Sequence, residues 1–143
     1  MGAGEQKQVL PLCRKMIKMS YYFVLPMIAA IFLFPNLLLH IYTDSLSLIA
    51  ASVPALLVMT SVYLIAVPAN ILFNAVSGTG NTRSALVMEM ATLAVYVLYI
   101  VYVVFYLKAD VAIAWTAEHV YSLIMVILSF AYLRNANWQS KKI

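Results

Sequence analysis

Two glutamates lie inside long apolar stretches of the sequence and are its first candidates for chemistry. Glu89 lies about one and a half helical turns into the segment 84–107, and Glu118 lies about two turns into the segment 111–133. A charge within the lipid core of a membrane is costly, so an acidic residue there is a functional candidate. Glu89 is near enough to the end of its segment to reach the headgroup layer or Arg83. Glu118 either accepts a structural hydrogen bond or handles substrate or protons.

The two glutamates are not expected to act as a pair. If their segments are antiparallel helices that rise about 1.5 Å per residue, Glu118 lies level with Tyr99 and Tyr102. Glu89 then lies near the opposite face of the membrane. The expected hydrogen-bond partner of Glu118 is therefore Tyr99, Tyr102 or the neighbouring His119. His119 itself is typical of a hydrogen-bonded helix residue.

A second group of polar side chains is predicted on the apolar segment 46–76. Asn70 and Asn74 are four residues apart, so a helix places both amides on one face. Tyr63, seven residues before Asn70, extends this face toward the middle of the membrane. Such side chains either join neighbouring helices or line a passage. Together with Glu118, these three residues are our candidates for a substrate or ion pathway.

The stretch SGTGNTR separates two apolar segments and contains Gly78, Gly80, Thr82 and Arg83. A phosphate-binding P-loop needs a Lys-Ser/Thr pair after its last glycine, and a dinucleotide-binding loop needs a third glycine. Neither is present. We interpret the stretch as a short cytoplasmic turn in which both glycines supply unusual backbone angles. Asn81 or Thr82 is expected to cap the following helix, and Arg83 to lie among lipid headgroups.

Other kinds of chemistry have little support in the sequence. Cys13 is the only cysteine, so no intrachain disulfide or thiolate metal site can form. His40 and His119 do not have a metal-ligand spacing, and no metal site or cofactor is expected. No nucleophile, base and orienting acid occur together, so we expect the protein not to be an enzyme.

The composition of the chain points to a membrane protein. Of its 143 residues, 65% are hydrophobic and 10% are charged, and the mean hydropathy is +0.95. A typical soluble domain is about 45–50% apolar and about 25% charged. Nine basic and five acidic residues cannot cover the exterior of a soluble fold of this size. The basic residues form no stripe interleaved with aromatic residues, so a nucleic-acid partner is not expected.

Four apolar segments are long enough to cross a hydrocarbon core, which takes about 20 residues of helix. They must be helices because lipid cannot solvate open strand edges, and they lack the strict alternation of barrel strands. The fold class is therefore an all-α membrane helix bundle. Four prolines within the segments predict kinks. The predicted spans are 18–42, 46–76, 84–107 and 111–133, and the prolines are Pro26, Pro35, Pro54 and Pro68.

The distribution of basic residues predicts the orientation of the chain. Eight of the nine basic residues lie before the first span, between the second and third spans, or after the fourth, and only Lys108 lies between the third and fourth. Cytoplasmic loops carry the excess of Lys and Arg, so both termini are expected in the cytoplasm. The eight are Lys7, Arg14, Lys15, Lys18, Arg83, Arg134, Lys141 and Lys142.

With these features in place, nearly the whole chain resembles the C-terminal third of a multidrug and toxin extrusion (MATE) transporter. The stretch VSGTGNTRSALVMEM resembles the turn between helices ten and eleven of that family. MGAGEQKQVLPLCRKMIKMS resembles its entry into helix nine, IYTDSLSLIAASVPALLVM its entry into helix ten, and VAIAWTAEHVYSLIMVILSFAYLRNANW its helix twelve. The turn is the most specific of these stretches.

The resemblance implies a bacterial inner-membrane antiporter with two six-helix lobes. Such a protein exports drugs or organic cations in exchange for sodium ions or protons. Residues 1–143 would then be part of the C-terminal lobe, a fragment that needs the missing N-terminal helices as its partner. The sequence departs from the family in having four spans rather than about twelve. Some members use an acidic residue in helix ten, and 46–76 contains none.

Three other functions are alternatives to the MATE-type exporter. A small dimeric four-helix multidrug transporter fits the length of the chain, but that class depends on an acidic residue in its first helix, and 18–42 contains none. A flippase for lipid-linked sugars shares the architecture of the MATE superfamily. A membrane scaffold without transport activity would pack against a larger protein.

Overall fold

The computed structural model describes residues 8–135 and confirms an all-α fold with four helices long and apolar enough to cross a membrane. No strand occurs within these residues. The elements in chain order are α1 (Val9–Leu33), α2 (Pro35–Leu39), α3 (Leu46–Gly78), α4 (Thr82–Val101), the π-helix η2 (Tyr102–Tyr106), α5 (Val111–Ala114) and α6 (Ala117–Arg134).

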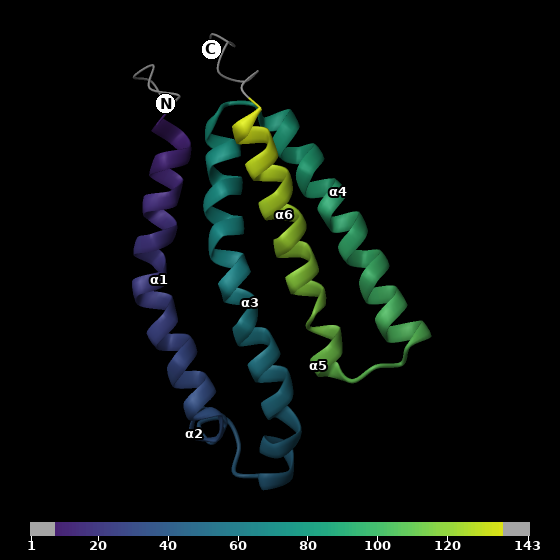
Figure 1. Ribbon diagram of the computed structural model, residues 1–143. Helices are drawn as coiled ribbons and strands as arrows, with labels where there is room; N and C mark the ends of the chain where they lie inside the picture. Colours follow the sequence, from purple (N-terminus) through teal and green to yellow (C-terminus); the bar gives the residue numbers. More distant parts are fainter. Residues whose placement is uncertain (1–7, 136–143) are drawn as a thin grey trace.

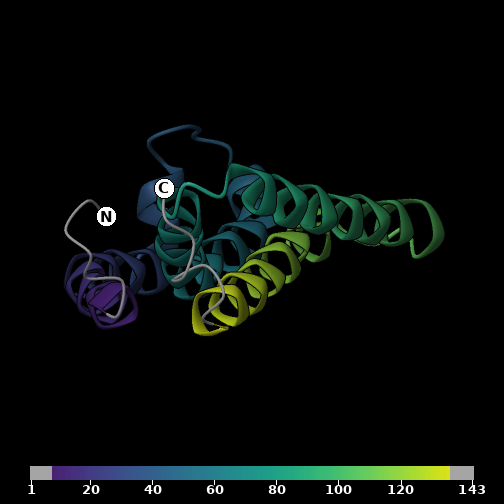
Figure 2. The same cartoon turned by 90° about the horizontal axis from the view of Figure 1, so that it is seen from above.

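The four long helices are arranged with α3 and α6 in the middle. Figures 1 and 2 show α1 beside α3 on one side and α4 beside α6 on the other. The start of α1, the α3–α4 turn and the end of α6 lie at one end of the molecule (Figure 1). A core of buried side chains joins the helices at this end, consisting of Cys13, Leu72, Val76, Ala85 and Leu133.

The outer faces of the helices carry large apolar side chains. Phe23 is 75% exposed, Phe105 is 72% exposed and Leu98 is 69% exposed. In water this surface would drive aggregation, since soluble monomers rarely expose contiguous apolar patches larger than a few hundred Å². Lipid removes that cost because it is as apolar as these side chains. The exposure pattern therefore agrees with the membrane environment inferred from composition.

The first helix differs at both ends from the predicted span 18–42. α1 begins nine residues earlier, at Val9. Pro11 is compatible with this start because it lies in the first turn, where the missing N–H costs no hydrogen bond. Val9 and Leu10 pack against the core, which extends the helix through the basic residues. The helix ends at Leu33, well before the predicted residue 42.

A proline ends α1 rather than kinking it. Phe34 precedes Pro35 and has φ −132° and ψ 51°, because the proline ring disfavours helical angles in the residue before it. Pro35 then begins the short helix α2, where its fixed φ suits the first position. The kink predicted at Pro35 is therefore a break. Pro26, Pro54 and Pro68 lie inside continuous helices.

The turn between α3 and α4 corrects one prediction and confirms another. Gly80 has φ 79°, which favours glycine, whereas Gly78 is the last residue of α3 and has no positive φ. Asn81 caps α4 by accepting a hydrogen bond from the Ser84 N–H at 3.3 Å. Its amide also donates to the Tyr132 hydroxyl of α6 at 3.0 Å, which fixes the turn against the bundle.

The other end of α4 has an irregular backbone that the apolar pattern did not predict. The helix widens into η2, where the Leu107 N–H donates to the Tyr102 carbonyl five residues earlier, at 3.1 Å. Lys108 follows with φ 46°, an uncommon angle for a residue other than glycine. The chain then forms α5 and bends at residues 115–116 before α6 begins. Residues of α4 and α6 that are equally far from the connection along the sequence are therefore not level with each other, as they would be in two straight antiparallel helices.

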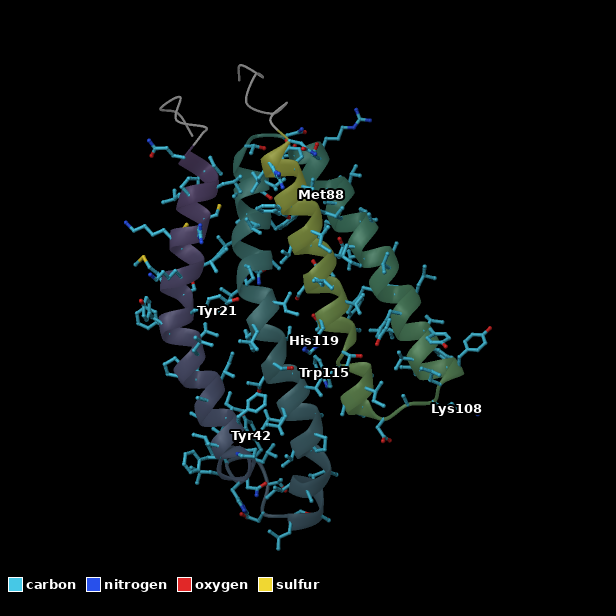
Figure 3. The ribbon with its side chains drawn as sticks, viewed as in Figure 1. Tyr21, Tyr42, Met88, Lys108, Trp115 and His119 are labelled. Carbon is cyan, nitrogen blue, oxygen red and sulfur yellow. The ribbon has the colours of Figure 1, made fainter. Side chains whose placement is uncertain are left out.

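The proline inside the second half of α3 is compensated by another helix. Pro68 has no N–H, so the Leu64 carbonyl four residues earlier lacks its usual donor. The Tyr21 hydroxyl of α1 donates a hydrogen bond to this carbonyl. Tyr21 lies near mid-height on α1 (Figure 3). The bond therefore joins α1 to α3 at the one carbonyl that Pro68 leaves without a donor.

Replacing Tyr21 by Phe is expected to destabilise the bundle by about 1 kcal/mol, because it leaves the Leu64 carbonyl unsatisfied. The free energy of unfolding in mixed micelles measures this effect. In a Pro68→Ala background the restored N–H supplies the missing donor, so Tyr21→Phe should then cost much less. Tyr22→Phe is the control, because the Tyr22 side chain is 68% exposed. Equal costs of Tyr21→Phe in both backgrounds would contradict this account.

Candidate functional site

A groove of about 920 Å³ lies between α3, α4 and α6 and contains most of the polar side chains singled out from the sequence. Asn70 and Asn74 line it from α3, and Thr82 and Arg83 from the start of α4. The predicted face of α3 therefore meets the predicted turn. We call this the transport groove. Its other lining residues are Phe73, Ser77, Ala85, Leu86, Glu89 and Tyr121.

Glu89 gives the transport groove its carboxylate. One carboxylate oxygen accepts a hydrogen bond from the Tyr121 hydroxyl of α6 at 2.7 Å. Arg83 lines the same groove, six residues or about 9 Å of helix rise nearer the turn. The groove thus has a cation at its mouth and an acid further inside. Glu89 is half-buried, so this acid is partly withdrawn from the surface.

Glu118 binds a different tyrosine from those predicted. Its carboxylate accepts a hydrogen bond from Tyr96 of α4 at 2.9 Å. Tyr99 instead shares a hydrogen bond with Thr116 at 2.8 Å, and the Tyr102 ring stacks on Tyr106. The prediction was one to two turns off because it assumed a simple hairpin, whereas η2, α5 and the bend before α6 alter the register.

The two glutamates are connected, although the sequence predicted them near opposite faces. The rings of Tyr96 and Tyr121 meet edge to face, with centroids 5.9 Å apart and planes at 81°. Each hydroxyl binds the glutamate of the other helix, so Glu89, Tyr121, Tyr96 and Glu118 form a continuous set of contacts between α4 and α6. We call this set the glutamate–tyrosine ladder. It links the transport groove to the polar part of α6.

His119 places an imidazole next to the ladder. Its Nε2 shares a hydrogen bond of 2.8 Å with the Ser61 hydroxyl of α3, which also lies 2.7 Å from the Val58 carbonyl. Which of the two atoms donates depends on the tautomer of the ring. Nδ1 is buried and has no hydrogen-bond partner among the described residues. Figure 3 shows His119 near Trp115 at the α5–α6 bend.

Tyr63 and Asn70, which were both placed on one face of α3, differ in their relation to the groove. Tyr63 is 50% exposed and does not line the transport groove. Asn70 donates to the Ala66 carbonyl of its own helix at 2.9 Å, which does not join α3 to another helix. Its place in the groove favours the lining role over the joining role.

The sequence analysis missed the functional partners Tyr96, Tyr121 and Ser61. A signal for two of them was present in the spacing. Tyr96 follows Glu89 by seven residues and Tyr121 follows Glu118 by three, so each helix presents a glutamate and a tyrosine on one face. Crosswise pairing of such faces was therefore foreseeable. Ser61 carries no comparable signal, because its contact depends on the packing of α3 against α6.

This arrangement suits the binding of a cation and the movement of protons. A carboxylate with amides and aromatic rings around it can hold an organic cation in an apolar setting. Tyrosine hydroxyls that donate to carboxylates, next to a free imidazole nitrogen, can exchange protons between oxygen and nitrogen atoms. Among the described residues, no group of three or more His, Cys, Asp or Glu side chains is placed to hold a metal ion.

Four apolar spans, of which three line a polar groove and two carry hydrogen-bonded carboxylates, define a polytopic membrane protein with a polar site within its spans. The sequence model of the MatE family matches residues 1–104, which is most of the chain. The chain therefore belongs to the MatE family and is a MATE-type transporter. The match includes the groove residues of α3 and α4, and it ends before α6. No curated protein and no solved structure matches the chain.

The bond between Tyr96 and Glu118 is testable by a double-mutant cycle. Tyr96→Phe and Glu118→Ala should each destabilise the protein, and their combination should cost less than the sum, with a coupling of about 0.6–2 kcal/mol. Reversible unfolding in mixed micelles gives the free energies. Tyr102→Phe is the matched control, because Tyr102 was a predicted partner that stacks on Tyr106 instead. Coupling of Glu118 to Tyr102 rather than to Tyr96 would refute the observed register.

Proposed function

We propose that the protein is a secondary active efflux antiporter that exports drugs or other amphipathic organic cations. The observation that carries this proposal is the transport groove, in which the Glu89 carboxylate lies among amides and aromatic rings within the spans. A permanent cation with an apolar body would place its charge at Glu89 and its rings against Phe73 and Tyr121. Arg83 at the mouth would repel the bound cation and so favour its release toward the opposite side.

The proposed orientation places the chain ends and the α3–α4 turn in the cytoplasm of a bacterial inner membrane. Five basic residues of the described chain lie in the first half of α1, at the start of α4 or at the end of α6, and Lys108 lies beyond the other end of α4 (Figure 3). Such an excess marks the cytoplasmic side. Three further basic residues used in the prediction, Lys7, Lys141 and Lys142, lie outside the described residues. The five are Arg14, Lys15, Lys18, Arg83 and Arg134.

Alternating access requires a second group of helices that moves against this one around a shared site. The transport groove is open at its surface, and in the lipid core the exposed Asn70 and Asn74 and the half-buried Glu89 would be costly. We therefore propose that further helices of the transporter, equivalent to the N-terminal lobe of the family, cover the groove. The substrate would bind between the two groups.

Removing the charge of Glu89 tests the proposed substrate site. Cells that lack other exporters and express Glu89→Gln should export ethidium at least about tenfold more slowly, because an ion pair at 4 Å in an effective dielectric of about 20 is worth about 4 kcal/mol. Fluorescence of accumulated ethidium gives the rate. Asp110→Asn is the control, because Asp110 is exposed in the η2–α5 connection. Unchanged efflux in Glu89→Gln would remove the groove from the pathway.

For the coupling ion, we propose that Glu118 carries the proton that is exchanged for the substrate. It faces Tyr96 from α4, and His119 and Tyr121 lie near it on α6. α3 has no Asp, Glu, Lys, Arg or His, and its nearest contact with this region is Ser61. Through the contacts of the ladder, protonation of Glu118 would change the hydrogen bond that Glu89 accepts.

Replacing Glu118 by Gln should abolish uphill ethidium export driven by a proton gradient and leave ethidium binding within about threefold, because the amide keeps a hydrogen bond but cannot exchange a proton. Proteoliposomes with imposed proton or sodium gradients measure export, and fluorescence anisotropy measures binding. Export by Glu118→Gln with unchanged pH dependence would exclude this role. Export driven by sodium alone would assign the coupling to that ion.

A further inference from the structure

A second groove, of about 590 Å³, lies between α1 and α6 on the side of the bundle away from α4. Cys13 and Ile17 line it from α1, Leu72 from α3 and Phe130 from α6. None of its lining residues lines the transport groove. Its volume lies within the range of about 300–1,000 Å³ that is typical of ligand sites. We call it the α1–α6 groove.

One charged side chain borders this apolar groove, and it is basic. Arg14 is exposed and lines the groove. Lys18 follows one helical turn later and Lys15 lies next to Arg14, and both are exposed. α1 contains no acidic residue. No acidic side chain of the described residues lines the groove, so it is an apolar groove with a positive rim, which fits a ligand that has an anionic head and an apolar tail.

The spacing along α1 places the charges and the apolar wall on adjoining strips of one helix. Arg14 and Lys18 are four residues apart, so they lie on one face, and Ile17 lies beside them. Arg14 is five residues, or about 8 Å, from the start of the helix. α1 has 25 residues and is about 38 Å long, against a hydrocarbon core of about 30 Å. The first turns of α1 therefore extend beyond the hydrocarbon core. The long Arg and Lys side chains can reach the headgroups from there.

We propose that the α1–α6 groove binds one molecule of an anionic glycerophospholipid. The Arg14 guanidinium matches a phosphate group with two parallel hydrogen bonds, and Lys18 adds a second positive charge. One acyl chain lies over Leu72, between Ile17 and Phe130. Basic pockets between membrane helices are known lipid headgroup sites in general terms. The inference goes beyond the transport proposal, because it requires only that the chain is embedded in a membrane.

A lipid suits the observations better than the other occupants. A soluble phosphate compound would contact Arg14 and Lys18 but would leave the walls formed by Leu72 and Phe130 without a partner. A further apolar helix would fill the walls but would leave the basic rim without an anion. An anionic lipid satisfies both parts of the groove at once, since its phosphate and acyl chain are joined at the membrane surface.

Tryptophan quenching by brominated lipids tests the site in the full chain. A Phe130→Trp reporter is introduced together with Trp115→Phe and Trp138→Phe, and the protein is reconstituted in phosphatidylcholine vesicles. Brominated phosphatidylglycerol should occupy the groove at least about fivefold more strongly than brominated phosphatidylcholine, since each basic residue near the surface favours anionic lipid by about this factor. An Ile17→Trp reporter on the opposite wall should give the same preference.

Matched charge variants decide whether the preference belongs to the groove. Arg14→Gln with Lys18→Gln should reduce it below about twofold, and Arg83→Gln with Arg134→Gln should leave it unchanged. The second pair removes the same charge at the same end of the molecule. An equal loss of lipid preference in both pairs of variants would overturn the proposal, because the preference would then come from the general surface charge. Equal quenching by both lipids would show ordinary lipid contact, and quenching by neither would show that protein covers the groove. Either result would also overturn the proposal.

Discussion

The structure depends on one constraint, which is that lipid cannot hydrogen-bond to the backbone or to polar side chains. Some polar side chains within the helices meet this constraint inside their own helix. Thr60, Asn70 and Thr92 donate to carbonyls four residues earlier, at 2.7–2.9 Å. Where a proline removes a donor, as at Pro68, another helix supplies it through Tyr21. Other polar side chains bind a side chain of a neighbouring helix although no backbone group there lacks a partner. Such contacts need a separate explanation.

The groups that stand out by this criterion gather on the first turns of α6. Between Thr116 and Tyr121, four side chains bind other helices: Thr116, Glu118 and Tyr121 contact α4, and His119 contacts α3. Replacing such contacts by apolar packing would lower the desolvation cost of two carboxylates. Their presence therefore needs a reason other than stability. Charge handling within the membrane provides one, in accord with the family to which the chain belongs.

Sequence reasoning reached the fold because span length and composition dominate in lipid. It also placed Asn70 and Asn74 on one face of their helix, where both line the same groove, since helical periodicity is a local property. It failed where the outcome depended on irregular backbone. The π-helix at residues 102–106 and the bend at 115–116 shift the register of α6 against α4, so Glu118 reaches Tyr96. Apolar runs contain no signal for either irregularity.

In the proposed function, a substrate cation at Glu89 would compete with the hydrogen bond from Tyr121. A cation that approaches Glu89 meets a carboxylate already bound by Tyr121, so binding must weaken that bond or recruit the second carboxylate oxygen. If the Tyr121 hydroxyl is displaced, its ring contact with Tyr96 changes, and with it the donor to Glu118. Protonation of Glu118 would act in the reverse direction, because coupling between two sites is reciprocal. The edge-to-face contact between two rings is therefore the step at which the two charges influence each other.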